Sequence, residues 1–296
     1  QRPVHKVTLY GFWMDKFEVT NNKFDEFVKA TKYVTFAEKV PTAQNLGLTK
    51  EEFARIDPAN IKAGSIVFKP PAQLIPLEKL RSPQTFYIWW RYVAGANWRH
   101  PDGPKSSIAG KGNHPVVHIC WHDAVAYTKW AKKKLPTEAQ WEYAARGGLK
   151  GKEFVWGDKQ KPAGRPMANI WHGRFPTQNT LEDKYKYTAP VGQFPANGYG
   201  LYDVAGNVWE WCLDKYDSSY YDNSPAENPL STDYADIQAL LDNYDSVSST
   251  RVLRGGDWFN NTLNLRVAYR GSYDPNARHP AGGFRCVSGL NFTTDS

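Results

Sequence analysis

Residues 254–270, RGGDWFNNTLNLRVAYR, combine a double glycine with a tryptophan, three asparagines and three arginines, and the role of this stretch decides what the protein does. Gly255 and Gly256 predict a close backbone approach or a positive φ, which glycine adopts without steric cost. In one interpretation the stretch braces a loop-rich fold. Trp258 and Phe259 would then belong to the core, and the arginines would bond to carbonyls or carboxylates.

In the alternative interpretation the same stretch lines a groove that grips an extended peptide. Its amides would bond to the peptide backbone and its aromatic rings would cover peptide side chains. The candidate groove residues are Asp257, Trp258, Asn260, Asn261 and Arg266. The sequence leaves both interpretations open and predicts no catalytic residue.

Composition favours short elements over long helices. The 296 residues include 12 Trp, 17 Tyr and 14 Phe beside 23 Gly and 20 Pro, so we expect many turns and a core of large flat side chains. The net charge is +7, but the basic residues are scattered and residues 214–248 are acidic. Because the surface is two-signed, we expect no nucleic-acid partner.

No run approaches the roughly 20 apolar residues of a membrane span, so we expect no transmembrane segment in this chain. The chain shows no signal peptide, but its first residues, QRPVHKVTLYGFW, already belong to a strand-like pattern, as in a mature or trimmed segment. Export, and an anchor outside these residues, therefore remain open.

Hydrophobic periodicity predicts three helices and two strand regions. Helices are expected after Thr20, over residues 122–134, and over 136–148 with a capping box and a glycine cap. Residues 4–20 predict a strand pair, and residues 114–121 a buried strand. After residue 150 the runs are short and divided by Gly, Pro, Asn and Asp. We therefore predict one α+β domain over residues 1–296 with little regular structure and irregular insertions at about 40–88 and 214–248.

His114, His118 and His122 are spaced by four residues, which would suggest a metal face on a continuous helix. The intervening residues predict a strand and then a helix start, so ordinary packing and capping is the favoured interpretation. Cys120, Cys212 and Cys286 allow at most one internal disulfide, in any of three pairings.

Six ordered motifs resemble one family along nearly the whole chain, the two insertions excepted. They are FWMDKFEVTN, GANWRHPDGP, HPVVHICWHDAVAYTKWAKKKLPTEAQWEYAARGG, NGYGLYDVAGNVWEW, RVLRGGDW and GFRCV. The sequence is similar to the formylglycine-generating enzyme, or sulfatase-modifying-factor, family. The resemblance implies a variant of the C-type lectin fold with bound calcium.

Active members of that family oxidise a substrate cysteine to formylglycine with Cu(I) held by two cysteines, five residues apart. Here the first of these positions is Asn260, the second falls near Leu265, and the serine after the double glycine is Asp257. Soft thiolates select Cu(I) and a carboxamide does not, so we expect no copper. In family members Cys286 can pair with a cysteine where this chain has Thr128. An unlinked Cys286, or a bridge to Cys120, is therefore expected.

The resemblance also implies two calcium sites, because Ca²⁺ takes six to eight oxygen ligands. In the first, Asn169 and Asp183 would supply side-chain oxygens, and Ile170 and Tyr185 main-chain carbonyls. In the second, Asp203 and Glu210 would supply carboxylates. Gly206 and Val208 would add main-chain carbonyls to it.

The family includes members without the cysteines that are not catalytic. By this resemblance we expect the protein to be a calcium-stabilised, non-catalytic binding or assembly module that is exported and has a protein or peptide partner. An enzyme with altered, non-copper chemistry on a peptide or small molecule is the alternative. Formylglycine synthesis with a relocated thiol is a third and weaker one.

Overall fold

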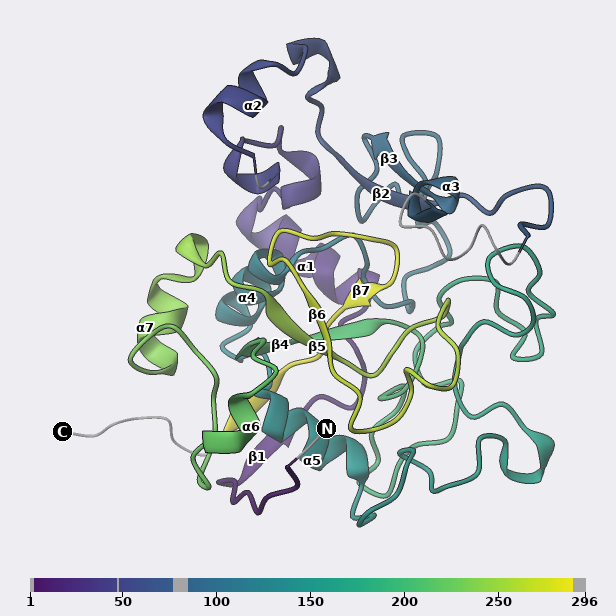
Figure 1. The fold of residues 1–296 in the computed structure, drawn as a ribbon, viewed down its shortest axis with the longest axis vertical. Helices are drawn as coiled ribbons and strands as arrows, with labels where there is room; N and C mark the ends of the chain where they lie inside the picture. Colours follow the sequence, from purple (N-terminus) through teal and green to yellow (C-terminus); the bar gives the residue numbers. More distant parts are fainter. Residues whose placement is uncertain (1–2, 47, 77–84, 290–296) are drawn as a thin grey trace.

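A four-stranded sheet lies at the centre of the computed structural model, which describes residues 3–46, 48–76 and 85–289 (Figure 1). The strand order is β6-β5-β4-β7. β5 runs antiparallel to both β4 and β6, and β7 runs parallel to β4. The strands are β4 (Trp209–Lys215), β5 (Arg251–Arg254), β6 (Gly271–Tyr273) and β7 (Gly282–Gly283).

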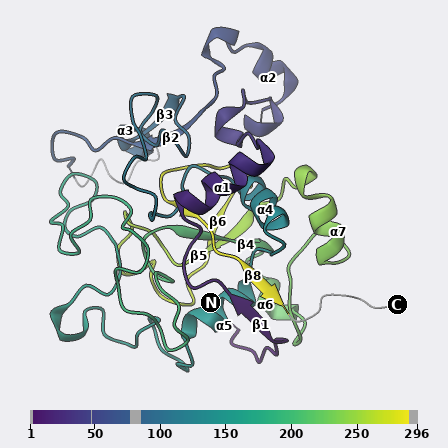
Figure 2. The same cartoon turned by 180° about the vertical axis from the view of Figure 1, so that it is seen from behind.

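Two further strand pairs flank this sheet. β1 (Phe12–Met14) pairs with β8 (Val287–Gly289) from the other end of the chain, and Figure 2 shows the two side by side. β2 (Gly64–Phe68) and β3 (Trp90–Ala94) form an antiparallel hairpin.

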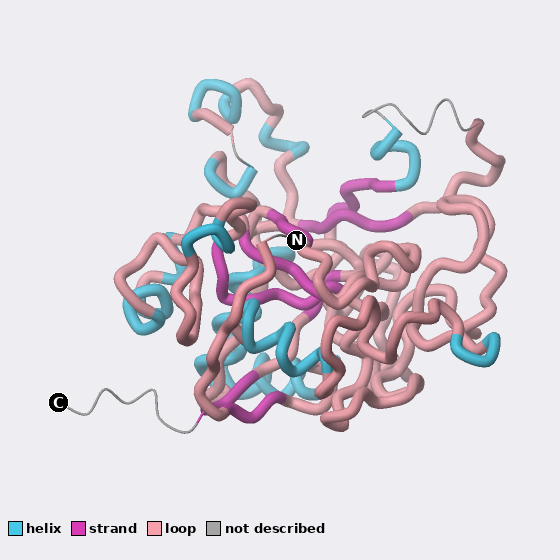
Figure 3. Tube along the Cα trace, turned by 60° about the horizontal axis from the view of Figure 1, so that its bottom comes forward, coloured by secondary structure: helices cyan, strands magenta, loops and turns pink. Residues whose placement is uncertain are grey.

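The helices are short. The longest are α1 (Asn21–Thr31), α4 (Trp121–Trp130) and α5 (Glu138–Arg146). The remaining α-helices are α2 (Lys50–Ala54), α3 (Phe86–Trp89), α6 (Tyr220–Asn223) and α7 (Ile237–Asp242). Loops account for most of the trace in Figure 3, so the predicted scarcity of regular structure is confirmed. Within the described ranges, none of these helices is long and apolar enough to cross a membrane.

The predicted starts of α1 and α5 are confirmed by their caps. The Thr20 hydroxyl accepts a hydrogen bond from the Lys23 N–H at 3.4 Å. Thr137 and Gln140 form the expected capping box, and Gly147 ends α5 with a φ of 54°. These ends were predictable because a cap involves only residues three or four positions apart.

Three expected elements differ in the structure. Within residues 4–20 no internal strand pair forms, since β1 takes its partner from the opposite end of the chain. Residues 114–121 are largely buried but form no strand, because their N–H groups donate to carbonyls of separate segments. The helix expected over 122–134 ends at Trp130, and Lys132 has a φ of 54°.

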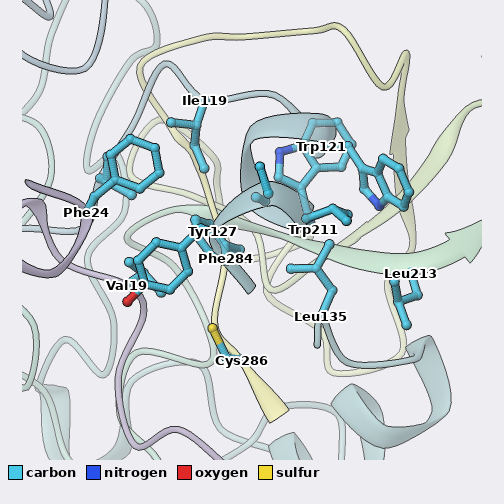
Figure 4. Packing of buried hydrophobic residues seen from close by; sticks show 14 of the residues in the cluster. Val19, Phe24, Ile119, Trp121, Tyr127, Leu135, Trp211, Leu213, Phe284 and Cys286 are labelled. Carbon is cyan, nitrogen blue, oxygen red and sulfur yellow. The ribbon is translucent and has the colours of Figure 1, made fainter. Parts of the chain in front are cut away.

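The main apolar cluster packs α1 and α4 against the central sheet (Figure 4). Phe24 from α1 and Trp121 from α4 are fully buried in it, together with Trp211 from β4. A separate aromatic cluster joins the β2–β3 hairpin to the stretch after β5 through Phe68 and Trp258, whose ring centroids lie 5.5 Å apart. The first predicted insertion thus contributes Phe68 to a shared core.

The turn after α5 provides a matched pair of glycine substitutions. Gly147 and Gly151 both have positive φ, but a Cβ at residue 147 would lie 2.6 Å from the Gly198 nitrogen, whereas a Cβ at 151 would meet nothing within 4 Å. Both Gly→Ala changes carry the left-handed backbone cost of about 1–2 kcal/mol. We expect Gly147→Ala to lower the melting temperature clearly more than Gly151→Ala in differential scanning calorimetry. Equal shifts would contradict the close backbone approach.

Candidate functional site

The double glycine after β5 turns the chain inward. Gly255 and Gly256 have φ values of 94° and 75°. A Cβ on Gly256 would lie 2.9 Å from Leu265 Cδ2. The loop therefore closes on itself before the chain returns as β6, and the predicted need for glycine is met at both positions.

Asp257 and Trp258 face the interior. Their side chains are 0% and 1% exposed. The indole N–H of Trp258 donates to the Pro280 carbonyl at 3.1 Å. Asp257 accepts the Phe259 N–H at 3.1 Å with Oδ1, while its buried Oδ2 has no partner. Burial raises the pKa of Asp257 well above its usual range.

The other three predicted groove residues lie nearer the surface. The Asn260 carbonyl accepts the Trp171 N–H at 3.1 Å, and its side-chain Oδ1 has no partner. Asn261 is exposed and accepts the Leu263 N–H. Arg266 donates to the Leu263 carbonyl at 2.9 Å. The five predicted residues thus divide into two that face the core and three near the surface.

No sulfur is present in residues 254–270, and the three thiols of the chain lie elsewhere. Cys120, Cys212 and Cys286 are free and fully buried, so Cys286 is unlinked. Figure 4 shows Cys286 in the main apolar cluster. Burial raises the pKa of all three thiols well above the usual value.

The first predicted calcium-ligand set is brought together around Asp183. Its carboxylate accepts the N–H groups of Ile170 at 2.9 Å and Tyr185 at 3.0 Å. Asn169 donates its side-chain amide to the Tyr187 carbonyl at 2.8 Å. That orientation leaves the buried Asn169 Oδ1 without a partner. The set therefore offers an unused buried oxygen beside a carboxylate.

The second predicted set has two unused carboxylate oxygens nearby. Asp203 accepts the Gly192 N–H at 2.6 Å with Oδ2, and its Oδ1 is buried without a partner. Glu18, which was not predicted, has a buried Oε2 in the same state. Burial, and then the charge of Asp203, raises the pKa of Glu18 well above its usual range. Burial likewise raises the pKa of Asp203 to about 6.

Glu210, the other carboxylate of this set, is held by Arg285. The guanidinium donates to both carboxylate oxygens at 2.7 Å, and both side chains are buried. Gly206 has a φ of 78°, and a Cβ there would lie 2.5 Å from the Asn169 carbonyl oxygen. The two predicted sets are therefore in contact, and Val208 is buried between Gly206 and the start of β4.

Asn207 links the first set to Glu18 by hydrogen bonds. Its side-chain amide donates to Glu18 Oε1 at 3.0 Å, and its Oδ1 accepts from the Asn169 amide at 3.1 Å. Its carbonyl accepts the Trp258 N–H at 3.0 Å. The motif DVAGNVWE was recognisable in the sequence, but this role of Asn207 depends on its φ of 61° and on segments far away in the chain.

The three spaced histidines have separate partners. His114 bonds to Thr188, His118 to Ser65, and His122 to the Tyr244 carbonyl. Throughout the described ranges, no three His, Cys, Asp or Glu side chains converge into a metal site on their own. Amide and carbonyl oxygens would have to complete any cation site.

Comparison with known proteins places this arrangement in a family. Residues 1–290 match the sulfatase-modifying factor enzyme 1-like domain. The formylglycine-generating enzyme of Streptomyces coelicolor is 41% identical over 100% of this chain and 84% of its own length. That of Mycobacterium tuberculosis is 40% identical over 97% of this chain and 91% of its own.

An inactive relative and a solved structure complete the comparison. Inactive C-alpha-formylglycine-generating enzyme 2 of Bos taurus is 36% identical over 97% of this chain and 80% of its own length. The structure of PvdO from Pseudomonas aeruginosa has a TM-score of 0.60 at 22% identity and covers 98% of this chain and 85% of that one. It supports the predicted α+β fold alone. The chain belongs to the sulfatase-modifying-factor family of formylglycine-generating enzymes.

Proposed function

We propose that this protein is a non-catalytic member of its family that binds a peptide or protein partner. The observation that carries the proposal is the sulfur-free stretch after the double glycine. Asn260 and Leu265 supply no thiolate there, and the three thiols of the chain are buried and free elsewhere. Cu(I) needs soft ligands, so the residues present do not fit copper.

The proposal includes two calcium ions as structural cofactors. Ca²⁺ is a hard cation that takes carboxylate, amide and carbonyl oxygens. The unpartnered Asn169 Oδ1 beside Asp183, and the unpartnered Asp203 Oδ1, fit that preference. When bound, the ions would offset buried negative charge and tie the loops together. Calcium is abundant outside the cytosol, which suits an exported protein.

A copper titration tests the proposal directly. With fully reduced protein and a chromophoric Cu(I) chelator as competitor, we expect no stoichiometric metal transfer to the protein, because buried protonated thiols are poor ligands. Incubation with a cysteine-containing peptide should yield no aldehyde detectable by mass spectrometry. Tight uptake of one Cu(I), or aldehyde formation, would overturn the non-catalytic assignment.

Partner binding is tested with a displayed library of extended peptides. Asn260 Oδ1 has no partner and Asn261 is exposed, so Asn260→Ala, Asn261→Ala and Arg266→Ala should each weaken binding of selected peptides. The stability change should not exceed the loss of one loop hydrogen bond, about 1 kcal/mol. Arg91→Gln, an exposed change on β3, is the control. Peptides that turn over, with the same variants losing turnover, would instead support an enzyme with altered chemistry.

A further inference from the structure

A cavity of about 190 Å³ lies between the β2–β3 hairpin and the segments around β6. Its walls are mainly aromatic, with Trp90 and Tyr92 from β3 and with Phe259 and Tyr273 from the C-terminal part of the chain. A dry cavity of about 150 Å³ accommodates benzene. This cavity therefore has room for one aromatic ring and a small polar group.

His279 contributes a neutral ring to the cavity wall. Its Nδ1 accepts the Ala281 N–H at 3.3 Å, so in the neutral ring the hydrogen is on Nε2. Burial lowers the pKa of His279 to about 4, which makes the ring neutral at pH 7. The buried Nε2 has no hydrogen-bond partner. That nitrogen has no accessible surface and lies against Gly282, where an added Cβ would be 3.2 Å from it, so it does not donate into the cavity.

Arg278 adds positive charge to the same wall. Its Nε donates to the Gly64 carbonyl at 3.1 Å and its Nη1 to the Asn276 carbonyl at 3.0 Å. No acidic residue is among those that line the cavity, and over the described part of the chain Arg278 forms no ion pair. The guanidinium is thus oriented by the backbone while its charge is left uncompensated.

Two of the three hydroxyl groups in the cavity wall, those of Ser65 and Tyr92, are already bonded. The Ser65 hydroxyl donates to the Arg278 carbonyl at 2.9 Å, and the Tyr92 hydroxyl donates to the Lys62 carbonyl at 2.7 Å. Their hydrogens are therefore already used. The polar groups left for a ligand are the Arg278 guanidinium, which only donates, and the Tyr273 hydroxyl, which can donate or accept.

We propose that this cavity binds a carboxylate carried by an aromatic ring. The ring would pack between Trp90 and Phe259, and the carboxylate would accept hydrogen bonds from the Arg278 guanidinium. A free aromatic acid and the C-terminal aromatic residue of a peptide share this chemistry. The inference depends on the cavity alone, so it would still hold if the protein were found to bind copper.

Calorimetric titration with phenylacetate and its neutral analogue phenylacetamide tests the proposal. We expect phenylacetate to bind about tenfold or more tightly than the amide, because charge-assisted hydrogen bonds to arginine are stronger than neutral ones. Arg278→Gln should remove that preference. Arg91→Gln is the matched control. Arg91 lies in β3 between the wall residues Trp90 and Tyr92, but it is exposed and does not line the cavity.

A second variant keeps the test independent of the backbone contacts of Arg278. Ala277 lines the cavity, so Ala277→Trp should fill it and abolish binding with the donors intact. A peptide with a C-terminal phenylalanine, titrated as free acid and as amide, separates the two sources of the carboxylate. Equal affinity for phenylacetate and phenylacetamide, or equal binding by the Arg278→Gln and Arg91→Gln proteins, would overturn the proposal.

Discussion

Arg285→Met is expected to lower the free energy of unfolding by about 3–5 kcal/mol, because it leaves the buried Glu210 carboxylate without its cation, with only the Trp141 indole N–H, among the described side chains, still donating to it. The Arg285 guanidinium donates to both oxygens of Glu210 and also to the Tyr202 carbonyl at 2.8 Å. The neighbouring carboxyls of Glu18 and Asp203 would also lose its compensating charge. Urea unfolding of the calcium-free protein, followed by fluorescence, measures the loss.

Two controls separate charge compensation from general disruption. The double variant Arg285→Met with Glu210→Gln should recover part of the loss, since the uncompensated charge is removed. Lys23→Met breaks an ion pair with Glu26 that lies on the surface, and it should change stability by no more than about 1 kcal/mol. A loss for Arg285→Met as small as that of Lys23→Met would show that the buried pair contributes little.

Calcium chelation is expected to lower the melting temperature at pH 7.5 by about 5–10 °C per bound ion. An ion present at a hundredfold excess over its dissociation constant stabilises the fold by about 2.7 kcal/mol, and each kcal/mol shifts a chain of this size by roughly 2–4 °C. Differential scanning calorimetry with and without a chelator measures the difference. Added Ca²⁺ should restore the original value, and an unchanged melting temperature would count against structural calcium.

The chelated protein should also become less stable as the pH rises through about 6. Burial raises the folded-state pKa of Asp203 to about 6, above its usual value of 3.8. The neutral carboxyl therefore contributes stability that is complete below pH 3.8 and is lost as the pH rises through 6. The loss is up to about 3 kcal/mol. Asp203→Asn should flatten this part of the pH profile, whereas an unaltered profile would assign the pH dependence to other groups.

Local rules account for the parts of the fold that the sequence predicted. The Thr20 cap, the Thr137 capping box and the Gly147 end of α5 each involve residues a few positions apart. The absence of cysteine at positions 260 and 265 could also be seen from the sequence, because it depends only on which residues stand there. The expected calcium ligands at Asn169 and Asp183 came from the family resemblance, and in the structure Asp183 accepts the N–H of Ile170, the residue after Asn169.

Strand pairing could not be predicted in the same way. β1 and β8 are joined from opposite ends of the chain, and the predicted strand at 114–121 fails because its N–H groups bond to several remote segments. A periodic pattern describes which face of a segment is apolar, but it does not say which distant backbone will supply the hydrogen bonds. These hydrogen-bond partners come close to the strand only when the whole chain has folded.

The sequence alone determined the family, the short capped helices and the absence of sulfur from the stretch after the double glycine, since each follows from residue identity at short spacing. Only the tertiary structure decided that Asp257 and Trp258 face the core, that Arg285 compensates Glu210, and that Arg278 meets Trp90 and Phe259 at one aromatic cavity. Burial and charge compensation depend on contacts between segments remote in sequence, and these arise when the loops pack together.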